Sequence, residues 1–290
     1  MSREYTIIAD STNDLPDYII KENNIKIVHL LYDIDGETYG KDRELSPHEF
    51  YQKMREGGST KTAAANTEEI SQCFREVLDE GKDILFMCLS SGISSTVGNA
   101  FVCKSELEEE YPESKICVID SLCASGGQGF LLYLAIDNLK KGMDVEENYK
   151  SLEAIKLNIV HKFTVEDLVY LQRGGRISKA AATLGTMINL KPLLHVDNEG
   201  KLVAESKVRG RKKSLQQMVK DMEKSMGSYR DKQDLIIICH ADVEEDVQYT
   251  ANLIKQTYNP AKIIISGVTP TIGAHSGPGT IAIFFLGDIR

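Results

Sequence analysis

The sequence predicts an α/β protein, with a parallel-sheet domain of the doubly wound type followed by a smaller two-layer α+β domain. Three observations support this fold class. Short, nearly continuous apolar runs alternate with helix-length amphipathic segments through the first half. The second half contains a hairpin signal at residues 197–200. A helical pattern near residue 155 separates the two halves, so we expect domains at residues 1–155 and 156–290.

The predicted strands of the first half are almost entirely apolar, as in parallel sheets that are covered on both faces. They lie at residues 5–9, 25–32, 84–89 and 116–119. The helices between them have recognisable starts. Ser46, followed by proline and then Glu49, forms a capping box, and Asn66 before Glu69 repeats the signal. A further helix at residues 127–140 ends before Gly142.

In the second half, two runs flank the sequence Asp-Asn-Glu-Gly and predict an antiparallel pair of strands. The runs lie at residues 193–196 and 202–208. Helices are expected at residues 145–160, 212–226 and 243–256, and further strands at residues 235–239, 263–268 and 281–286. Antiparallel pairing combined with helices predicts a two-layer α+β arrangement.

The composition is that of a globular protein of 290 residues, with 42% hydrophobic and 27% charged residues. No apolar stretch reaches the roughly 18 to 20 residues of a membrane span, and the chain runs into its first strand without a signal-peptide core. The six cysteines lack a CxxC spacing and are expected to be reduced. We therefore expect a cytoplasmic protein. The net charge of −9 argues against nucleic acid as a partner.

Polar residues follow three of the predicted parallel strands, at the edge where open α/β sheets bind ligands. Asp10, Ser90 and Asp120 begin these polar segments. The pattern has two interpretations. The side chains converge on a ligand, or the acidic residues simply cap loops and helices, as Asp and Ser commonly do.

Two distant segments rich in small residues allow close approach to a ligand. One is residues 90–96, with sequence Ser-Ser-Gly-Ile-Ser-Ser-Thr, and the other is residues 273–279, with sequence Gly-Ala-His-Ser-Gly-Pro-Gly. They offer hydroxyls, backbone N–H groups and one imidazole, but no carboxylate or thiol, which favours holding an anion over cutting a bond. Alternatively, His275 is a loop residue held by its own backbone, and Thr62 shapes the turn before a helix.

Several catalytic and cofactor motifs do not fit. Residues 92–96 resemble a nucleophile elbow but lack its closing glycine. Residues 277–282 match GxGxxG/A but open a strand, without the acidic residue about twenty positions later. The sequence has no phosphate loop of the GxxxxGK[ST] type and no HExxH pair, and its histidines are scattered. We therefore expect no cofactor and no metal site.

Two basic clusters remain. Arg173 and Arg176 flank a pair of glycines, and residues 207–213 place several cations at a helix start. Positive charge there opposes the helix dipole. This cluster has two interpretations. The charges bind a phosphate or an acidic partner, or they form a solvated face that contributes little to stability.

Together these segments resemble the DegV family of bacterial fatty-acid-binding proteins. The matching segments are residues 8–12, 14–16, 61–62, 89–96, 118–121, 170–178 and 273–279. The resemblance implies a Rossmann-like domain joined to a smaller α/β domain, with a long-chain fatty acid buried at or near their interface. It also implies a binding subunit that is not itself an enzyme. A separate ATP-dependent fatty acid kinase would phosphorylate the bound carboxylate to an acyl phosphate.

Carried over by this resemblance, four residues would bind the fatty acid carboxylate: Thr62, Ser94, Ser95 and His275. Arg173 and Arg209 would lie near the head group or dock the kinase. The chain departs from the family pattern at residues 63–65, which are all alanine where Ser-Gln-Pro is frequent, and at Ser95, where glycine is frequent. These departures put chain-length or partner preference in doubt, while carboxylate binding through Thr62 is retained.

The small residues at 180–182 and Gly185, beside Leu184 and Met187, could line the tunnel for the acyl chain, or pack against a neighbouring helix. We expect a monomer whose contact with membranes is at most transient. Two other functions stay open. One is a small-molecule kinase or transferase-like enzyme that holds a carbonyl substrate at His275. The other is a small-anion sensor that contacts its partner through residues 209–213.

Overall fold

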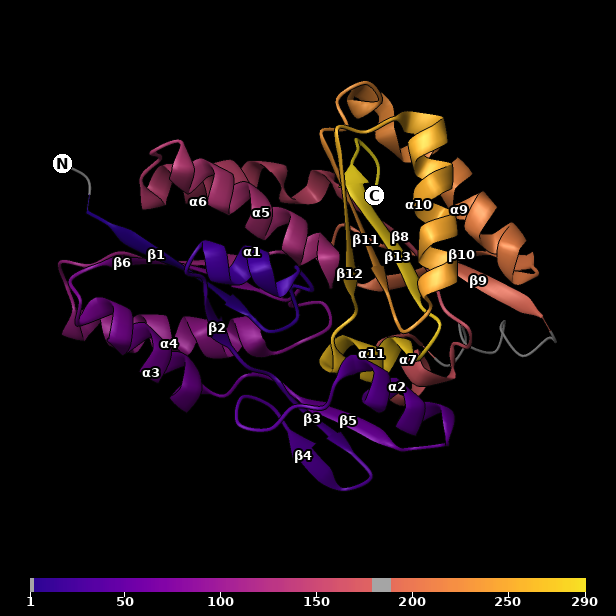
Figure 1. Cartoon of the computed structure of the whole chain (residues 1–290). Coiled ribbons are helices and arrows are strands. Elements are labelled where there is room, and N and C mark those ends of the chain that lie inside the picture. The colour runs from indigo at the N-terminus through magenta and orange to yellow at the C-terminus, as the bar shows by residue number, and fades with distance from the viewer. Residues whose placement is uncertain (1–2, 179–188) are drawn as a thin grey trace.

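The computed structural model describes residues 3–178 and 189–290, and it confirms the α/β class. In the described part of the chain the strands form three sheets (Figure 1). A four-stranded parallel sheet lies on one side of the molecule, a six-stranded mixed sheet lies on the other, and a three-stranded antiparallel sheet lies beside both.

The parallel sheet has the strand order β2-β1-β6-β7 and is built as predicted from buried apolar runs. Its strands are β1 (Tyr5–Asp10), β2 (Lys26–Val28), β6 (Asp83–Cys88) and β7 (Ile116–Asp120). Helices α3 (Thr67–Leu78) and α4 (Thr96–Glu110) cover one face; α1 (Asp17–Glu22), α5 (Gly126–Lys140) and α6 (Val145–Ile155) lie on the other. The predicted Asn66 cap is present, since its side chain accepts a hydrogen bond from the N–H of Glu69.

The prediction of one strand at residues 25–32 is wrong, because the chain leaves the parallel sheet after β2. The N–H of His29 donates to the Glu69 carboxylate and the N–H of Leu30 donates to the Ser11 hydroxyl. These side chains accept hydrogen bonds from backbone N–H groups that would otherwise pair with a neighbouring strand. The chain then enters a second sheet, of order β4-β3-β5, through β3 (Leu31–Ile34), β4 (Glu37–Tyr39) and β5 (Thr60–Ala63).

The mixed sheet has the order β10-β9-β8-β13-β11-β12, and the predicted hairpin joins β9 to β10. Its strands are β8 (Ile159–Thr164), β9 (Leu190–Val196), β10 (Leu202–Arg209), β11 (Leu235–His240), β12 (Lys262–Gly267) and β13 (Ile281–Leu286). Helices α9 (Arg211–Met226) and α10 (Glu244–Tyr258) pack on one face of this sheet. A short 3-10 turn, Gly227–Tyr229, follows α9.

A single helix over residues 145–160 is a wrong prediction. Helix α6 ends at Ile155, the 3-10 turn Lys156–Asn158 follows, and β8 begins at Ile159. Strand β8 lies between β9 and β13, and its side chains are buried throughout. Pairing on both edges therefore overrides the local helical pattern here.

Helix α5 connects the two large sheets and is buried on nearly all sides. Its first turn is rich in glycine because a side chain has no room. An added Cβ would lie 2.7 Å from the Cys239 Sγ at Gly126, 2.1 Å from the His161 Nε2 at Gly127, and 2.3 Å from a backbone oxygen at Gly129. One hydrophobic core consequently runs through both halves of the chain. The division at residue 155 stays a prediction.

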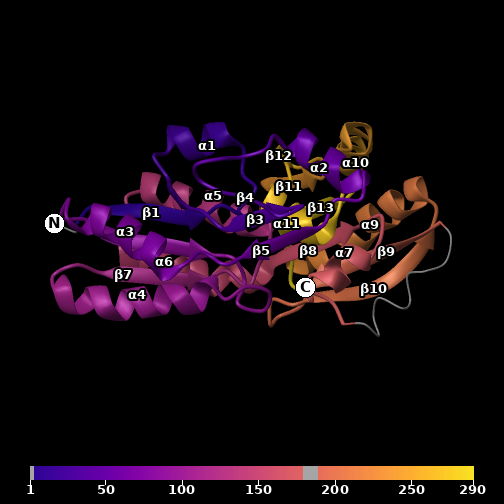
Figure 2. The same cartoon turned by 90° about the horizontal axis from the view of Figure 1, so that it is seen from below.

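The three-stranded sheet packs against a short helix from the far end of the sequence, α11 (Pro270–Ser276). The hydroxyl of Thr60 on β5 donates to the carbonyl of Ala274 at 2.9 Å. Helix α2 (Pro47–Arg55), which has the predicted capping box at Ser46, contributes Tyr51, whose hydroxyl donates to the Val268 carbonyl. Seen from below, β3 and β5 lie across the middle of the molecule, next to α11 (Figure 2).

Candidate functional site

A cavity of about 260 Å³ lies between the two halves of the chain. Its lining comes from β5, the loop before α4, the start of α5, the mixed sheet and α11. An apolar cavity of about 150 Å³ holds a benzene ring, so this one has room for a substantially longer hydrocarbon.

One wall of the cavity is an apolar floor made by the mixed sheet. Alternate residues of a strand face the same side, and here Ala282 and Phe284 of β13 lie beside Phe163 and His161 of β8. The five residues from Thr280 to Phe284 extend over about 13 Å of strand. The floor therefore fits an extended chain better than a compact ring.

His161 belongs to this floor without adding charge to it. Its Nε2 accepts the N–H of Ala124 at 3.1 Å, which leaves Nδ1–H to donate to the Ile159 carbonyl at 3.2 Å. Burial holds the pKa of His161 well below its usual value. The ring is neutral and stacks edge-to-face on Phe284, with centroids 5.2 Å apart.

The four residues expected at the carboxylate all belong to the lining of this cavity. The Thr62 hydroxyl and the His275 Nε2 are 2.7 Å apart. The Ser94 hydroxyl lies 3.0 Å from that of Thr96, and Ser95 is the N-cap of α4 without a side-chain capping bond. The first turn of α4 starts beside Ser95, and the N–H of Thr96 donates to the Ser94 hydroxyl at 3.3 Å.

His275 lies in helix α11 and not in a loop, which corrects that alternative. Pro270 opens the helix, and Gly277, with φ of +78°, ends it. The ring packs closely against Gly174, where an added Cβ would lie 2.0 Å from Nδ1. Burial, and then the charge of Arg176, lowers the pKa of His275 to about 4. The imidazole is therefore neutral at pH 7, and its buried Nδ1 has no hydrogen-bond partner among the described residues.

Arg176 is the residue that the sequence analysis missed. It lines the cavity, whereas Arg173 is exposed and does not. Arg176 donates to the carbonyls of Ile93, at 3.1 Å, and Gly174. Burial lowers its pKa, and no described carboxylate pairs with it. The sequence contains both arginines in the segment Arg-Gly-Gly-Arg, but their spacing does not show which of the two side chains faces the cavity.

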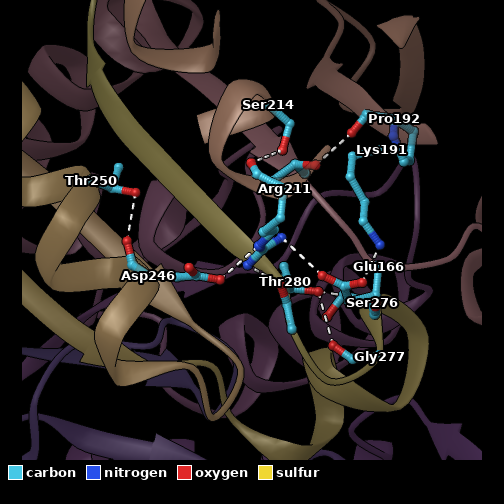
Figure 3. Close-up of polar contacts among 12 residues, drawn as sticks. Glu166, Lys191, Pro192, Arg211, Ser214, Asp246, Thr250, Ser276, Gly277 and Thr280 are labelled. Atoms are coloured by element: carbon cyan, nitrogen blue, oxygen red, sulfur yellow. Dashed lines mark hydrogen bonds and ion pairs between the residues drawn. The ribbon is translucent and has the colours of Figure 1, made fainter. Parts of the chain in front are cut away.

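One member of the second basic cluster, Arg211, is used within the protein. Arg211 pairs with Asp246 at 2.7 Å and with Glu166 at 3.4 Å (Figure 3). It also donates to the Gly279 carbonyl at 2.7 Å. This network ties α9 and α10 to the loop after α11. The charge of Arg211 is therefore neutralised within the protein. Arg209 is exposed at the end of β10 and does not line the cavity.

The acidic residues at the ends of the parallel strands act as caps, as the alternative interpretation held. Buried Asp10 accepts hydrogen bonds from the Thr12 hydroxyl, the Leu89 N–H and the Gln128 amide. Asp120 accepts the N–H groups of Ser91 and Leu122. Neither residue lines the cavity.

A second buried carboxyl lies behind the cavity. Asp14 accepts hydrogen bonds from the hydroxyl of Ser125, which lines the cavity, and from the N–H of Thr269, the N-cap of α11. Burial raises the pKa of Asp14 to about 6, although these hydrogen bonds oppose the shift. Asp14 and Ser125 both have positive φ, at 49° and 56°. Asp14 thus fixes the starts of α5 and α11 relative to each other.

The described ranges contain no group of three or more His, Cys, Asp or Glu side chains that could hold a metal. No helix in these ranges has the length and apolarity needed to cross a bilayer. The expected tunnel residues 180–182, Leu184, Gly185 and Met187 lie outside the described residues.

Comparison with known proteins supports one family along nearly the whole chain. The model of the DegV family, described as uncharacterised proteins, matches residues 4–288. A DegV domain-containing protein of Clostridium perfringens is 37% identical over 290 residues, 99% of each chain. A DegV family structure from Thermus thermophilus, described by its fatty acid binding, has 28% identity and a TM-score of 0.87 over 98% of this chain and 99% of that chain. DegV from Bacillus subtilis, described as a fatty acid binding protein, has 27% identity and a TM-score of 0.85 over 99% and 100%. This chain belongs to the DegV family.

Proposed function

We propose that this protein binds a long-chain fatty acid in the cavity and holds its carboxylate with Thr62, Ser94, Ser95 and His275. The observation that carries the proposal is the Thr62–His275 hydrogen bond at one end of an apolar cavity. Related structures from Thermus thermophilus and Bacillus subtilis, described by their fatty acid binding, support it.

The hydrocarbon tail supplies most of the affinity. Burial of about fourteen methylenes at ~0.8 kcal/mol each contributes roughly 11 kcal/mol before the costs of ordering and association. The apolar floor of Ala282, Phe284 and Phe163 provides the surface for this burial.

The head group requires hydrogen-bond donors because an unpaired buried carboxylate is costly. Hydroxyls, the neutral imidazole and the N–H groups at the start of α4 supply them. Among the described lining residues Arg176 is the one cation, and we assign it as the counter-charge of the carboxylate. This replaces the expectation that Arg173 lies at the head group.

We further propose that the bound carboxylate is presented to a separate ATP-dependent kinase subunit, which forms the acyl phosphate. A surface groove adjoins the cavity and shares Ile93, Arg176 and Leu202 with it. The groove gives a second protein access to the head-group end. Exposed Arg173 and Arg209 are proposed docking residues. In this proposal the chain is a monomeric cytoplasmic carrier that needs no cofactor, binds no nucleic acid and contacts membranes at most transiently.

Native mass spectrometry of the purified protein tests ligand binding. We expect one fatty acid for each chain, and rebinding of palmitate or oleate after lipid removal. A lipid-free protein that also fails to bind either acid would contradict the proposal. Addition of a fatty acid kinase subunit with ATP should produce acyl phosphate, and substitution of Arg173 by alanine should slow this step without changing palmitate affinity. Turnover of a carbonyl substrate without a partner would favour the enzyme alternative.

A further inference from the structure

Helix α4 carries apolar side chains on its outer side as well as on its inner one. It lies at the outer edge of the molecule (Figure 2). Phe101 and Val102 have 48% and 50% of their surface exposed, whereas the other large apolar residues exposed in the described ranges occur singly along the sequence. The apolar residues that α4 buries against the sheet follow a spacing of three to four, at Val97, Ala100, Cys103 and Leu107. Phe101 and Val102 lie outside this stripe and are free to contact a second molecule.

A glycine lies one turn before these two side chains, on the same side of the helix. Gly98 precedes Phe101 by three positions and Val102 by four. Glycine inside a helix is unfavourable relative to alanine, and an added Cβ at Gly98 would meet nothing within 4 Å. No neighbour in the described chain therefore requires a glycine here. The bare backbone leaves room for close approach of another molecule.

This side of the helix begins at the cavity. Ser95, the N-cap of α4, lines the cavity and is itself exposed. We define the outer face of α4 as the exposed residues that follow it at helical spacing, over about 21 Å of helix: Ser95, Gly98, Phe101, Val102, Glu106 and Glu109. A molecule bound along the outer face therefore reaches the place where the cavity meets the protein surface.

The far end of the outer face is acidic. Glu106 and Glu109 are exposed and form no ion pair within the part of the chain that the structure describes. The last turn of α4 contains no basic residue, so its acidic side chains oppose the helix dipole. An anionic membrane would be repelled by these carboxylates, and a two-fold copy of the chain would place them against each other. Basic side chains of a different protein would complement them.

We propose that the outer face of α4 is the docking surface for the separate protein that acts on the bound carboxylate. The partner's contact surface has an apolar hollow for Phe101 and Val102, bordered by basic side chains for Glu106 and Glu109. The inference rests on the proposed function and names where the partner binds. It adds an apolar and acidic contact to the proposed docking arginines.

Acyl-phosphate formation tests this surface, with a purified fatty acid kinase subunit, ATP, and the full-length, palmitate-loaded protein as the varied substrate. Phe101→Ser should raise the KM for the loaded protein about 10-fold, the effect of removing an apolar anchor from an interface. Palmitate affinity should stay unchanged, because Phe101 does not line the cavity. Tyr18→Ser, at another exposed aromatic residue, is the matched control and should keep the wild-type KM.

Two further variants separate close approach from charge. Gly98→Leu should raise the KM as Phe101→Ser does and leave the fold intact, since its side chain extends into open space. Glu106→Lys should raise the KM at low salt, and this difference should shrink at high salt. Glu245→Lys, at an exposed position of α10, should change neither value.

A wild-type KM in both Phe101→Ser and Gly98→Leu would overturn the inference while the proposed function stands. Flotation with phosphatidylglycerol vesicles, or a dimer in sedimentation, that Phe101→Ser abolishes would also overturn it, because a membrane or a second copy would then cover this face. A wild-type protein that binds palmitate but yields no acyl phosphate would contradict presentation to a kinase and the inference with it. Failure to bind palmitate would contradict the proposed function itself.

Discussion

The hydroxyl of Thr62 and the imidazole of His275 form a 2.7 Å hydrogen bond across 213 residues of sequence. Thr62 lies on β5 of the three-stranded sheet, and His275 lies on α11. The bond exists because this small sheet packs against a helix that belongs to the second half of the chain. The part of the cavity lined by Thr62 and His275 therefore forms only when both halves are folded together.

Thr62→Val should weaken fatty acid binding about 10-fold, because it removes one donor to the carboxylate and leaves His275 without its partner. Displacement titration with palmitate measures this loss, and Thr62→Ser should recover most of it. Thr38→Val, on exposed β4 of the same sheet, serves as the control and should bind like the wild type. Unchanged affinity in Thr62→Val would remove Thr62 from the proposed site.

Gly174→Ala should impair ligand binding because the added Cβ would lie 2.0 Å from His275 Nδ1. The ring or the end of α7 (Val169–Arg173) must shift, which costs about 1–3 kcal/mol. Urea denaturation measures the loss of stability, and palmitate titration the loss of affinity. Gly98→Ala is the matched control, since its Cβ meets nothing within 4 Å and the residue lies inside α4. It should stabilise the protein by about 1 kcal/mol. A Gly174→Ala protein with wild-type stability and affinity would contradict the close packing.

The lowered pKa of His275 makes stability depend on pH. Because the folded protein binds this proton less tightly than the unfolded chain, the stabilising contribution is complete above pH 6.5. It is lost as the pH falls towards the folded value of about 4. The shift corresponds to about 3 kcal/mol. His275→Gln should therefore lose less stability than the wild type between pH 7 and pH 4, as measured by urea denaturation at both values.

The stability contribution of Asp14 depends on pH in the opposite direction, because burial raises the pKa of this carboxyl from 3.8 to about 6. Its stabilising contribution is complete below pH 3.8 and is lost as the pH rises through 6. Asp14→Asn cannot ionise, so its stability relative to the wild type should increase by up to about 3 kcal/mol between pH 4 and pH 7. Asp17→Asn, at an exposed position of α1, is the control. Parallel stability profiles for Asp14→Asn and the wild type would show that Asp14 does not titrate in this range.

Much of the fold could be predicted because local signals and tertiary packing agree. The capping box at Ser46 and the cap at Asn66 are present, and the last strand has the predicted bounds. The predictions that failed concern segments whose structure is decided by hydrogen bonds to residues distant in the sequence. Residues 25–32 are divided between two sheets because Ser11 and Glu69 bind the backbone of Leu30 and His29. Residues 159–164 form a central strand because β9 and β13 pair with both of its edges.

The candidate site was predictable as a set of residue types, but not as an arrangement. Ser94 and His275 stood out because small residues surround them. Arg176 was missed and Arg173 preferred, although both flank the same two glycines. The orientation of each arginine depends on where the chain turns after α7, and a hydrogen bond to the Ile93 carbonyl holds Arg176 at the cavity. Asp14 belongs to one of the segments that carry the family resemblance, but no local pattern showed that it is buried beneath α5 and α11, where its pKa is raised.

The sequence by itself determined the α/β class, the helix starts, most strands and the supply of hydroxyls, imidazole and glycines for an anion site. These features depend on hydrophobic periodicity and on hydrogen bonds between residues close in the chain. Only the tertiary structure decided that Thr62 meets His275, that Gly174 lies beneath the imidazole, and that Arg176 faces the cavity. Such contacts depend on how two sheets pack around α5, and no local pattern encodes that geometry.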